Sequence, residues 1–386
     1  MISCGEPSGD LYAGALAVEI RRRAPDATIF GLGGQRMMAG GGELVADYHG
    51  LSVTGLVEAL SVVPRSFSVI GRLTALARSE RPDVAVIIDF PDFHLGFAGL
   101  GLAPRLKALG IPIVYYIPPQ LWAWRRSRLK LIKHVADRVL VIFPFEEALY
   151  QEAGIPVEFV GHPLIDLARA QEPPDVFRRD IGIDPTRPVV ALLPGSRRNE
   201  VERLLPVMRD AAVMLSAQIP SVQFIIARAP GLDDDLFRKH PWPGHRPIEV
   251  LARTDDVLAV ADAAVTASGT ATVQTALHGV PMVVVYKLSP ATYRMGRRFV
   301  HVDTFAMANL IAGRRIVPEL IQDNCTPDAV AREVAAYLTD PAHAERTRAA
   351  LREVRAKLGR PGASGRAADA VLRVAKAPSH RQAAHR

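Results

Sequence analysis

The sequence predicts two doubly wound α/β domains that face each other across a cleft. Short β-branched runs alternate with longer amphipathic segments along the chain, a pattern typical of βαβ units on a parallel sheet. Most strand candidates are apolar throughout, as expected when helices cover both faces of a sheet. The chain of 386 residues also exceeds the size of about 250–300 residues at which single cores stop growing.

Two series of elements support this prediction. In the first, strands are expected at residues 28–30, 84–88, 113–116, 138–142 and 158–160, and helices at 11–23, 67–79, 99–109, 127–135 and 145–153. In the second, strands are expected at 189–193, 223–227, 248–251, 263–266 and 282–285, and helices at 201–217, 256–261, 271–278, 291–299, 327–338 and 341–358. The charged, proline-bearing stretch from His162 to Pro188 separates them. We therefore expect an N-terminal domain over 1–165, a C-terminal domain over 166–358 and a basic, flexible tail over 359–386.

The first strand is a stub. Ile2-Ser3-Cys4 runs directly into a glycine loop, where a strand of about five residues is expected. This shortness predicts a translation start upstream of Met1.

Charge and cysteine content narrow the class of protein. A net charge of +7 and a pI near 9.6 favour an anionic partner, which leaves nucleic acid, a phosphate-bearing substrate and an anionic membrane surface open. Two distant cysteines suit a reducing cytoplasm. No signal peptide is visible, and the apolar stretch 111–124 is broken by prolines and shorter than the roughly 18–20 residues of a spanning helix. We expect a protein that does not cross a membrane and, lacking metal-ligand spacing, holds no metal.

Two turns in the second series have the features of a phosphate site. Gly195, Ser196 and Arg197 follow an apolar strand, so backbone N–H groups, a hydroxyl and a guanidinium can meet a ligand there. Ser268-Gly269-Thr270 repeats this arrangement at the start of a later helix. The alternatives are an ordinary strand–helix turn and a simple N-cap. Together the two turns favour a diphosphate site.

Acidic residues mark two turns of the first series. The loop with Glu6, Ser8, Gly9 and Asp10 has no G-x-G-x-x-G spacing, and its carboxylates favour a hydroxyl-rich ligand over phosphate, although Asp10 could simply cap its helix. Asp89 follows the apolar strand 84–88, where a general base can reach a ligand in the cleft. The alternative reading makes Asp89 a turn former.

A basic segment combines aromatic and cationic residues. It contains Trp122, Trp124, Arg125, Arg126 and Arg128 and suits a membrane interface or an anionic ligand, but a solvated helix face is the default interpretation. The apolar region 51–70 could likewise dock onto lipid, although core packing explains such a region more often.

These motifs together resemble the lipid-A-disaccharide synthase family. The resemblance rests on Gly5-Glu6-Pro7-Ser8-Gly9-Asp10, Asp89-Phe90-Pro91-Asp92-Phe93, Pro119-Gln120-Leu121-Trp122-Ala123-Trp124-Arg125, Phe159-Val160-Gly161-His162-Pro163, Leu193-Pro194-Gly195-Ser196-Arg197 and Asn309-Leu310-Ile311-Ala312-Gly313. They occur in the family's order and span nearly the whole chain. The tryptophan–arginine run and the Asn-Leu-Ile-Ala-Gly run are the most specific of them.

The resemblance implies a GT-B architecture and an inverting transfer of 2,3-diacylglucosamine from UDP to 2,3-diacylglucosamine 1-phosphate, without a cofactor or metal. It implies no nucleic acid and a peripheral location on the cytoplasmic face of the inner membrane, and it is compatible with a homodimer. Asp89 matches the family's essential aspartate, Arg197 its important arginine and Asn309 its functional asparagine. Gln274 is a departure, because related transferases carry a ribose-binding glutamate there.

Three rival functions remain to be weighed. Another GT-B enzyme, such as a UDP-N-acetylglucosamine epimerase or the undecaprenyl-linked peptidoglycan transferase, is disfavoured by the tryptophan–arginine run. A nicotinamide-dependent oxidoreductase is disfavoured by the missing G-x-G-x-x-G. A non-catalytic two-lobed solute-binding protein would need an export signal.

Overall fold

The computed structural model describes residues 1–51, 56–96, 99–119, 128–243, 246–288, 304 and 306–377, with the backbone alone for 56–62. The chain forms two compact units. Unit 1 contains Met1–Pro163 and Leu358–Arg386, and unit 2 contains Leu164–Arg298 and Val302–Lys357. The helix expected at 291–299 lies outside the described residues.

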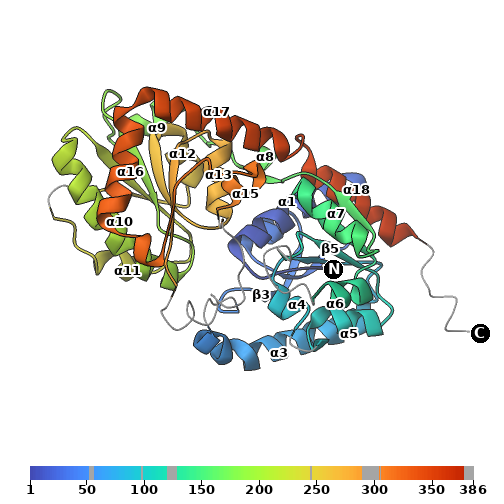
Figure 1. The fold of residues 1–386 in the computed structure, drawn as a ribbon. Helices are drawn as coiled ribbons and strands as arrows, with labels where there is room; N and C mark the ends of the chain where they lie inside the picture. The colour runs from blue at the N-terminus through green and yellow to red at the C-terminus, as the bar shows by residue number, and fades with distance from the viewer. Residues whose placement is uncertain are drawn as a thin grey trace, which may run out of the picture. The chain divides into compact units, whose positions relative to one another are not determined.

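Unit 1 is built on a parallel sheet whose seven described strands have the order β3-β2-β1-β4-β5-β6-β7 (Figure 1). The strands are β1 (Ile2–Cys4), β2 (Phe30–Gly33), β3 (Glu43–Asp47), β4 (Ala85–Ile88), β5 (Ile113–Tyr116), β6 (Arg138–Val141) and β7 (Val157–Phe159). The helices are α1 (Pro7–Arg23), α2 (Gln35–Ala39), α3 (Leu56–Glu80), α4 (Pro91–His94), α5 (Leu102–Ala108), α6 (Arg128–Val135), α7 (Pro144–Glu152) and α18 (Ala363–Lys376). Short as it is, β1 lies inside the sheet and pairs with both β2 and β4.

Unit 2 has a second parallel sheet, with six described strands in the order β10-β9-β8-β11-β12-β13. The strands are β8 (Val189–Leu193), β9 (Gln223–Arg228), β10 (Ile248–Leu251), β11 (Ala263–Ala267), β12 (Met282–Tyr286) and β13 (Glu319–Ile321). The helices are α8 (Leu164–Leu167), α9 (Pro174–Asp180), α10 (Arg198–Gln218), α11 (Asp234–Arg238), α12 (Thr254–Val260), α13 (Thr270–Leu277), α15 (Met307–Ala312), α16 (Pro327–Thr339), α17 (Pro341–Lys357) and the 3₁₀ helix η2 (Gln322–Asn324).

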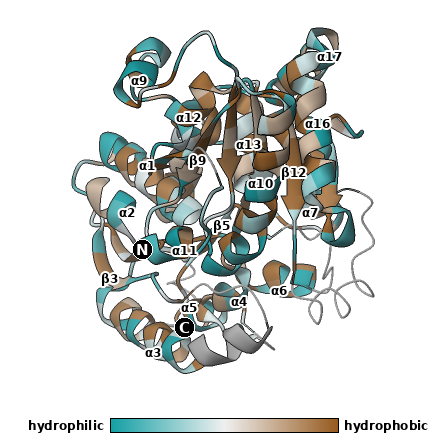
Figure 2. Cartoon of the chain, turned by 90° about the vertical axis from the view of Figure 1, so that its left-hand side faces the viewer, coloured by the Kyte–Doolittle hydropathy of each residue, from teal (hydrophilic) through white to brown (hydrophobic). Residues whose placement is uncertain are grey.

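The central strands β8, β11 and β12 of unit 2 are buried on both faces, as their continuous apolar sequence predicts. Figure 2 shows apolar colour along β9 and β12 and mixed colours along α10 and α16. Helices α10 and α16 pack together, and their apolar side chains join Val190, Leu192 and Val265 of the sheet in one core. Helix α16 begins at a proline after Thr326, whose hydroxyl accepts a hydrogen bond from the N–H of Ala329 (3.2 Å), which is a capped helix start.

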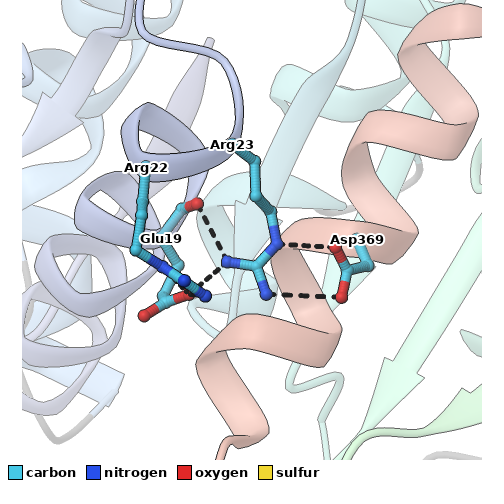
Figure 3. A network of polar contacts seen from close by, with 4 residues as sticks. All are labelled: Glu19, Arg22, Arg23 and Asp369. Carbon is cyan, nitrogen blue, oxygen red and sulfur yellow. Dashed lines mark hydrogen bonds and ion pairs between the residues drawn. The ribbon is translucent and has the colours of Figure 1, made fainter.

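The structure differs from the expected flexible tail at residues 363–376, which form α18. This helix packs against α1, and its buried residues include Ala363, Ala367, Ala368, Ala370 and Val371. Figure 3 shows Arg23 of α1 between Glu19 of the same helix and Asp369 of α18. The distance from Arg23 Nε to Asp369 Oδ1 is 2.6 Å. The hydrogen bond from Arg23 lowers the pKa of Asp369. The basic composition of residues 359–386 led to the prediction of a flexible tail, because the apolar face of this helix consists mostly of small residues.

No described helix is long and apolar enough to cross a membrane.

Candidate active site

Both sheets are parallel, so the carboxyl ends of their strands lie along one edge of each sheet. That edge is where open α/β sheets bind ligands. In each unit, turns that the sequence motifs indicate follow strands at this edge.

Asp89 lies at the carboxyl end of β4 in an unusual backbone conformation. Its φ is 45°, and that of Phe90 is 49°. The N–H of Asp89 lies 3.3 Å from the carbonyl oxygen of Tyr116 and 3.2 Å from that of Ile117. Left-handed backbone at non-glycine residues costs of order 1–3 kcal/mol each and persists only where surrounding contacts over-determine it. The residue is therefore held in place by its neighbours.

The acidic loop after β1 meets this strand end. Strands β1 and β4 are neighbours, and a Cβ atom on Gly5 would come within 2.0 Å of the Phe90 ring. Glu6 is the N-cap of α1, and Ser8 and Gly9 lie in its first turn. Tyr12 of α1 is buried, and its pKa is raised by burial and by the negative charge of Asp89. The structure thus brings Glu6 and Asp89 to neighbouring positions on one sheet edge.

Asp10 is engaged within the protein itself. Its Oδ1 accepts hydrogen bonds from the N–H groups of Gly34 (2.7 Å) and Met37 (3.0 Å), and its Oδ2 accepts one from Arg36 (3.0 Å). The carboxylate is 3% exposed. Asp10 therefore satisfies the first N–H groups of α2, rather than capping its own helix, and a direct substrate contact by Asp10 stays a prediction.

In unit 2, the turn between β8 and α10 already surrounds a carboxylate. Glu200 Oε2 accepts hydrogen bonds from the N–H groups of Ser196 (3.1 Å) and Arg197 (3.3 Å), and Oε1 accepts one from Arg197 Nη1 (2.9 Å). Gly195 has φ 117°, and a Cβ atom there would come within 2.4 Å of Glu200 Oε2. The turn is therefore a built anion-binding geometry, and a protein carboxylate occupies it in this structure.

The second turn lies beside the first. Strands β8 and β11 are paired, with Leu193 opposite Thr266, so the turns that follow them are neighbours. Gly269 has φ 137° and Thr270 begins α13, while Ser268 directly follows β11. Among the described residues, no atom outside the adjoining turn lies within 4 Å of a Cβ atom built on Gly269, so these residues leave the helix start open. The structure thus brings together the two turns that sequence analysis singled out.

Gln274 and Asn309 have partners within unit 2. Gln274 Nε2 donates to Asp255 Oδ1 (2.8 Å), and the same oxygen lies 2.9 Å from His278 Nε2. Asn309 is 1% exposed, its Oδ1 accepts the N–H groups of Ile316 (2.7 Å) and Val317 (3.0 Å), and its Nδ2 donates to the carbonyl of Val317 (2.9 Å). These bonds give Asn309 a structural role, and substrate contact by either residue stays a prediction.

Two further residues at this edge, Glu200 and Tyr286, were not predicted from the sequence motifs. Glu200 follows Arg197 by three positions, which is the spacing of a capping box and could have been recognised. Tyr286 ends β12, and its pKa is raised by burial and by Glu200, with Arg197 acting in the opposite direction. The charges of Glu200 and Arg197 reach Tyr286 because β12 lies two strands from β8 in the sheet, an order that sequence spacing does not reveal.

Of the basic segment that contains the two tryptophans, only Arg128 is among the described residues. Trp122, Trp124, Arg125 and Arg126 lie outside the described residues. Arg128 begins α6, and its guanidinium pairs with the carboxylate of Asp92. Among the described residues, no group of three or more His, Cys, Asp or Glu could hold a metal ion.

Solved structures that resemble this chain include a glycosyltransferase and a UDP-GlcNAc 2-epimerase. CalG4, the calicheamicin glycosyltransferase, has a TM-score of 0.59 at 19% identity, over 98% of this chain and 97% of that chain. UDP-GlcNAc 2-epimerase from Neisseria meningitidis, bound to UDP-GlcNAc, has a TM-score of 0.66 at 12% identity, over 96% of this chain and 98% of that chain. Such identities establish the fold alone. The two α/β domains are those of the GT-B class, as predicted.

Sequence relatives define the family. The family model described as lipid-A-disaccharide synthetase matches residues 1–374. Lipid-A-disaccharide synthase from Myxococcus xanthus is 42% identical over 373 residues, and that from Geobacter metallireducens is 43% identical over 375 residues, each covering 96% of both chains. The chain therefore belongs to the lipid-A-disaccharide synthetase family, which confirms the resemblance found in its motifs.

Proposed function

We propose that this glycosyltransferase moves 2,3-diacylglucosamine from UDP-2,3-diacylglucosamine to 2,3-diacylglucosamine 1-phosphate with inversion. The products are the β-1,6-linked lipid A disaccharide 1-phosphate and UDP. Family membership along residues 1–374 supports this reaction. The structural observation on which the proposal depends is the anion-binding turn at Gly195–Arg197, beside a second open helix start at Gly269.

The donor diphosphate is proposed to bind at these two turns. Arg197 and the N–H groups around Ser196 and Thr270 neutralise the charge that develops as UDP leaves, because preorganised donors stabilise a leaving anion strongly. Glu200 accepts hydrogen bonds from the N–H groups of Ser196 and Arg197 at the first of these turns. The diphosphate therefore has to displace this carboxylate or bind beside it. Gln274 is proposed to contact the ribose hydroxyls through its amide oxygen, since its Nε2 donates to Asp255.

Asp89 is proposed as the general base. It takes the proton from the 6-hydroxyl of the acceptor as that oxygen attacks the anomeric carbon of the donor. The bond from the anomeric carbon to the diphosphate oxygen breaks on the opposite face, and UDP leaves. Glu6 lies at the neighbouring strand end and is proposed to bind sugar hydroxyls, with Ser8, Gly9 and Asp10 forming the same loop.

The acyl chains of both substrates require contact with lipid, so we propose peripheral binding to the anionic cytoplasmic face of the inner membrane. Val63 and Phe67 of α3 are 40% and 44% exposed and lie four residues apart, hence on one helix face. Arg128 and the basic segment before it are proposed to meet acceptor phosphate or lipid headgroups.

Co-sedimentation with vesicles tests this docking. The protein should pellet with phosphatidylglycerol vesicles at low salt and be released at high salt, because salt screens the attraction. Phe67→Ser should weaken pelleting, whereas Leu251→Ser, at an exposed position of unit 2, should not. Protein that stays in the supernatant over anionic vesicles at low salt would contradict membrane docking.

The reaction itself is tested with the two proposed lipids. Purified protein should convert them to the disaccharide 1-phosphate and UDP in equal amounts, detected by mass spectrometry. In calorimetry UDP should bind and NAD should not. Release of free sugar, epimerised donor or no product at all would reject the proposed transfer.

A further inference from the structure

The peptide that follows Asp89 is held by side chains from two other elements. His94 is fully buried at the end of α4, and its Nδ1 lies 2.7 Å from the carbonyl oxygen of Asp89. The hydroxyl of Tyr115, on β5, lies 3.2 Å from the same oxygen. On the other side of the imidazole, Nε2 lies 2.8 Å from the hydroxyl of Ser3 on β1. Strands β1 and β5 flank β4, so the contacts enclose the end of that strand.

The partners determine the tautomer of His94. Burial lowers the pKa of His94 to about 4, so the ring is neutral at neutral pH. A carbonyl oxygen can only accept, hence Nδ1 carries the proton and donates it to Asp89. Nε2 is then an acceptor, and the Ser3 hydroxyl donates to it. The order of donors is Ser3 to His94 to the Asp89 carbonyl.

The hydrogen bonds to the Asp89 carbonyl oxygen stabilise a backbone conformation that is otherwise unfavourable. Asp89 and Phe90 have φ of 45° and 49° in succession. The N–H of Asp89 is bonded to the end of β5, and its carbonyl is bonded to His94 and Tyr115. With both ends of the residue fixed, the direction of its Cα–Cβ bond is fixed as well. A shift of about 1 Å at a reacting group can cost about 100-fold in rate.

We propose that His94, oriented by Ser3 and assisted by Tyr115, is a positioning residue that aims the Asp89 carboxylate for proton transfer. This inference rests on the proposed role of Asp89 as general base. His94 itself does not touch substrate or exchange a proton during the reaction. Its contribution is the Nδ1–H donor at the Asp89 carbonyl.

Two amide substitutions separate the two nitrogens of the ring. In His94→Asn the amide N–H can replace the Nδ1 donor, whereas in His94→Gln the longer side chain places its amide near Nε2 and loses that donor. We expect His94→Gln to lower kcat about 10–100-fold with the KM of both lipids within about twofold. His94→Asn should recover most of the lost rate.

A pair of buried tyrosines supplies the matched control. Tyr115 and Tyr150 are both fully buried in unit 1, but the Tyr150 hydroxyl has no hydrogen-bond partner among the described residues. Tyr115→Phe should lower kcat several-fold, and Tyr150→Phe should leave it unchanged. Circular dichroism and thermal melting report the folded fraction of each variant, so kcat is expressed per folded molecule.

Several outcomes would overturn the inference. Equal kcat in His94→Asn and His94→Gln, or a rise in KM with kcat unchanged, would do so. If the assignment of Asp89 as general base is wrong, Asp89→Asn will keep its turnover. This result distinguishes failure of the base assignment from failure of the positioning role of His94. If Asp89→Asn is inactive while His94→Gln and Tyr115→Phe match wild type, only the positioning role fails.

Discussion

The two sheet edges use opposite means to build a site. In unit 1, non-glycine residues at the ends of β4 and β5 adopt left-handed backbone, at Asp89, Phe90 and Ile117. In unit 2, the turns proposed for the diphosphate place glycines at such positions, Gly195 and Gly269. Glycine lets the chain approach a ligand closely and presents N–H groups, whereas a strained non-glycine residue presents a side chain.

The difference matches the chemistry proposed for each edge. A general base needs one carboxylate oriented toward one proton. At Asp89 the left-handed backbone is unfavourable, and buried hydrogen bonds to its carbonyl oxygen offset that strain. A diphosphate carries charge over many oxygens, so several backbone donors and a guanidinium suit it better. Unit 1 therefore fixes the orientation of the Asp89 side chain, whereas the glycine turns of unit 2 present backbone N–H groups. Four substitutions or conditions test this contrast.

Removing the base should have the largest effect. Asp89→Asn keeps the shape of the side chain but cannot accept the proton, so kcat should fall about 1,000-fold, within the range of general base catalysis. UDP affinity should not change, because the proposed diphosphate site lies in unit 2. The assay is disaccharide formation, with Asp26→Asn in an exposed turn as control. Turnover near wild type in folded Asp89→Asn would remove the base assignment.

Removing the guanidinium should act on the other edge. Arg197→Leu should weaken UDP binding about 10–100-fold, because hydrogen bonds to charged groups contribute about 1.5–3 kcal/mol. Calorimetric titration with UDP measures the change. The neighbouring Arg198 pairs with Glu202 at 3.3 Å on the surface, so Arg198→Leu should bind UDP as wild type does. Equal losses in both variants would indicate a general charge effect rather than a specific contact.

Closing the glycine turn should have a smaller effect. Gly195→Ala adds a Cβ within 2.4 Å of Glu200 Oε2 and should lower UDP affinity about 10-fold by disturbing the anion-binding turn. Gly182 also has positive φ, 74°, but no atom of the part of the chain that the structure describes lies within 4 Å of a Cβ built there. Gly182→Ala shares the backbone strain and should keep UDP affinity. Unchanged affinity in Gly195→Ala would argue against a close approach of ligand to this turn.

Protonation of His94 at low pH should have the smallest effect, and that effect is on the free energy of unfolding. The pKa of His94 is lowered by burial to about 4, below its ordinary value of 6.5. As pH falls below 6.5 the unfolded chain binds a proton that the folded chain does not, so the free energy of unfolding falls. From pH 7 to pH 5.5 this loss is about 1 kcal/mol.

Urea unfolding at the two pH values measures the loss. His94→Asn should show a weaker pH dependence than wild type by about 1 kcal/mol, since asparagine does not titrate. His162, whose pKa burial lowers to about 3, remains in both proteins and contributes equally to each. An identical pH dependence in the two proteins would mean that His94 is not buried in neutral form.

Much of the fold was predictable because it depends on local patterns. Apolar runs and turn residues located β4, β5, β8 and β11 closely, and with them Asp89 and the two glycine turns. Strands β3 and β13 were missed, since β3 is a half-buried edge strand and β13 has only three residues. Helix α18 was missed because the segment 359–386 as a whole has a basic composition, while the burial of the helix depends on α1, far away in sequence.

The sequence by itself determined the two parallel sheets, the turns at their carboxyl ends and the family. Only the tertiary structure decided which polar groups those turns hold. Ser3 and His94 are 91 positions apart, and Asp10 meets Gly34 across 24 positions. Periodicity reports which face of an element is buried, but a hydrogen bond depends on the position of a partner from another element. For that reason the contacts of Ser3 and His94 that we propose to orient Asp89 became visible only in three dimensions, whereas Glu200 was recognisable from its spacing to Arg197.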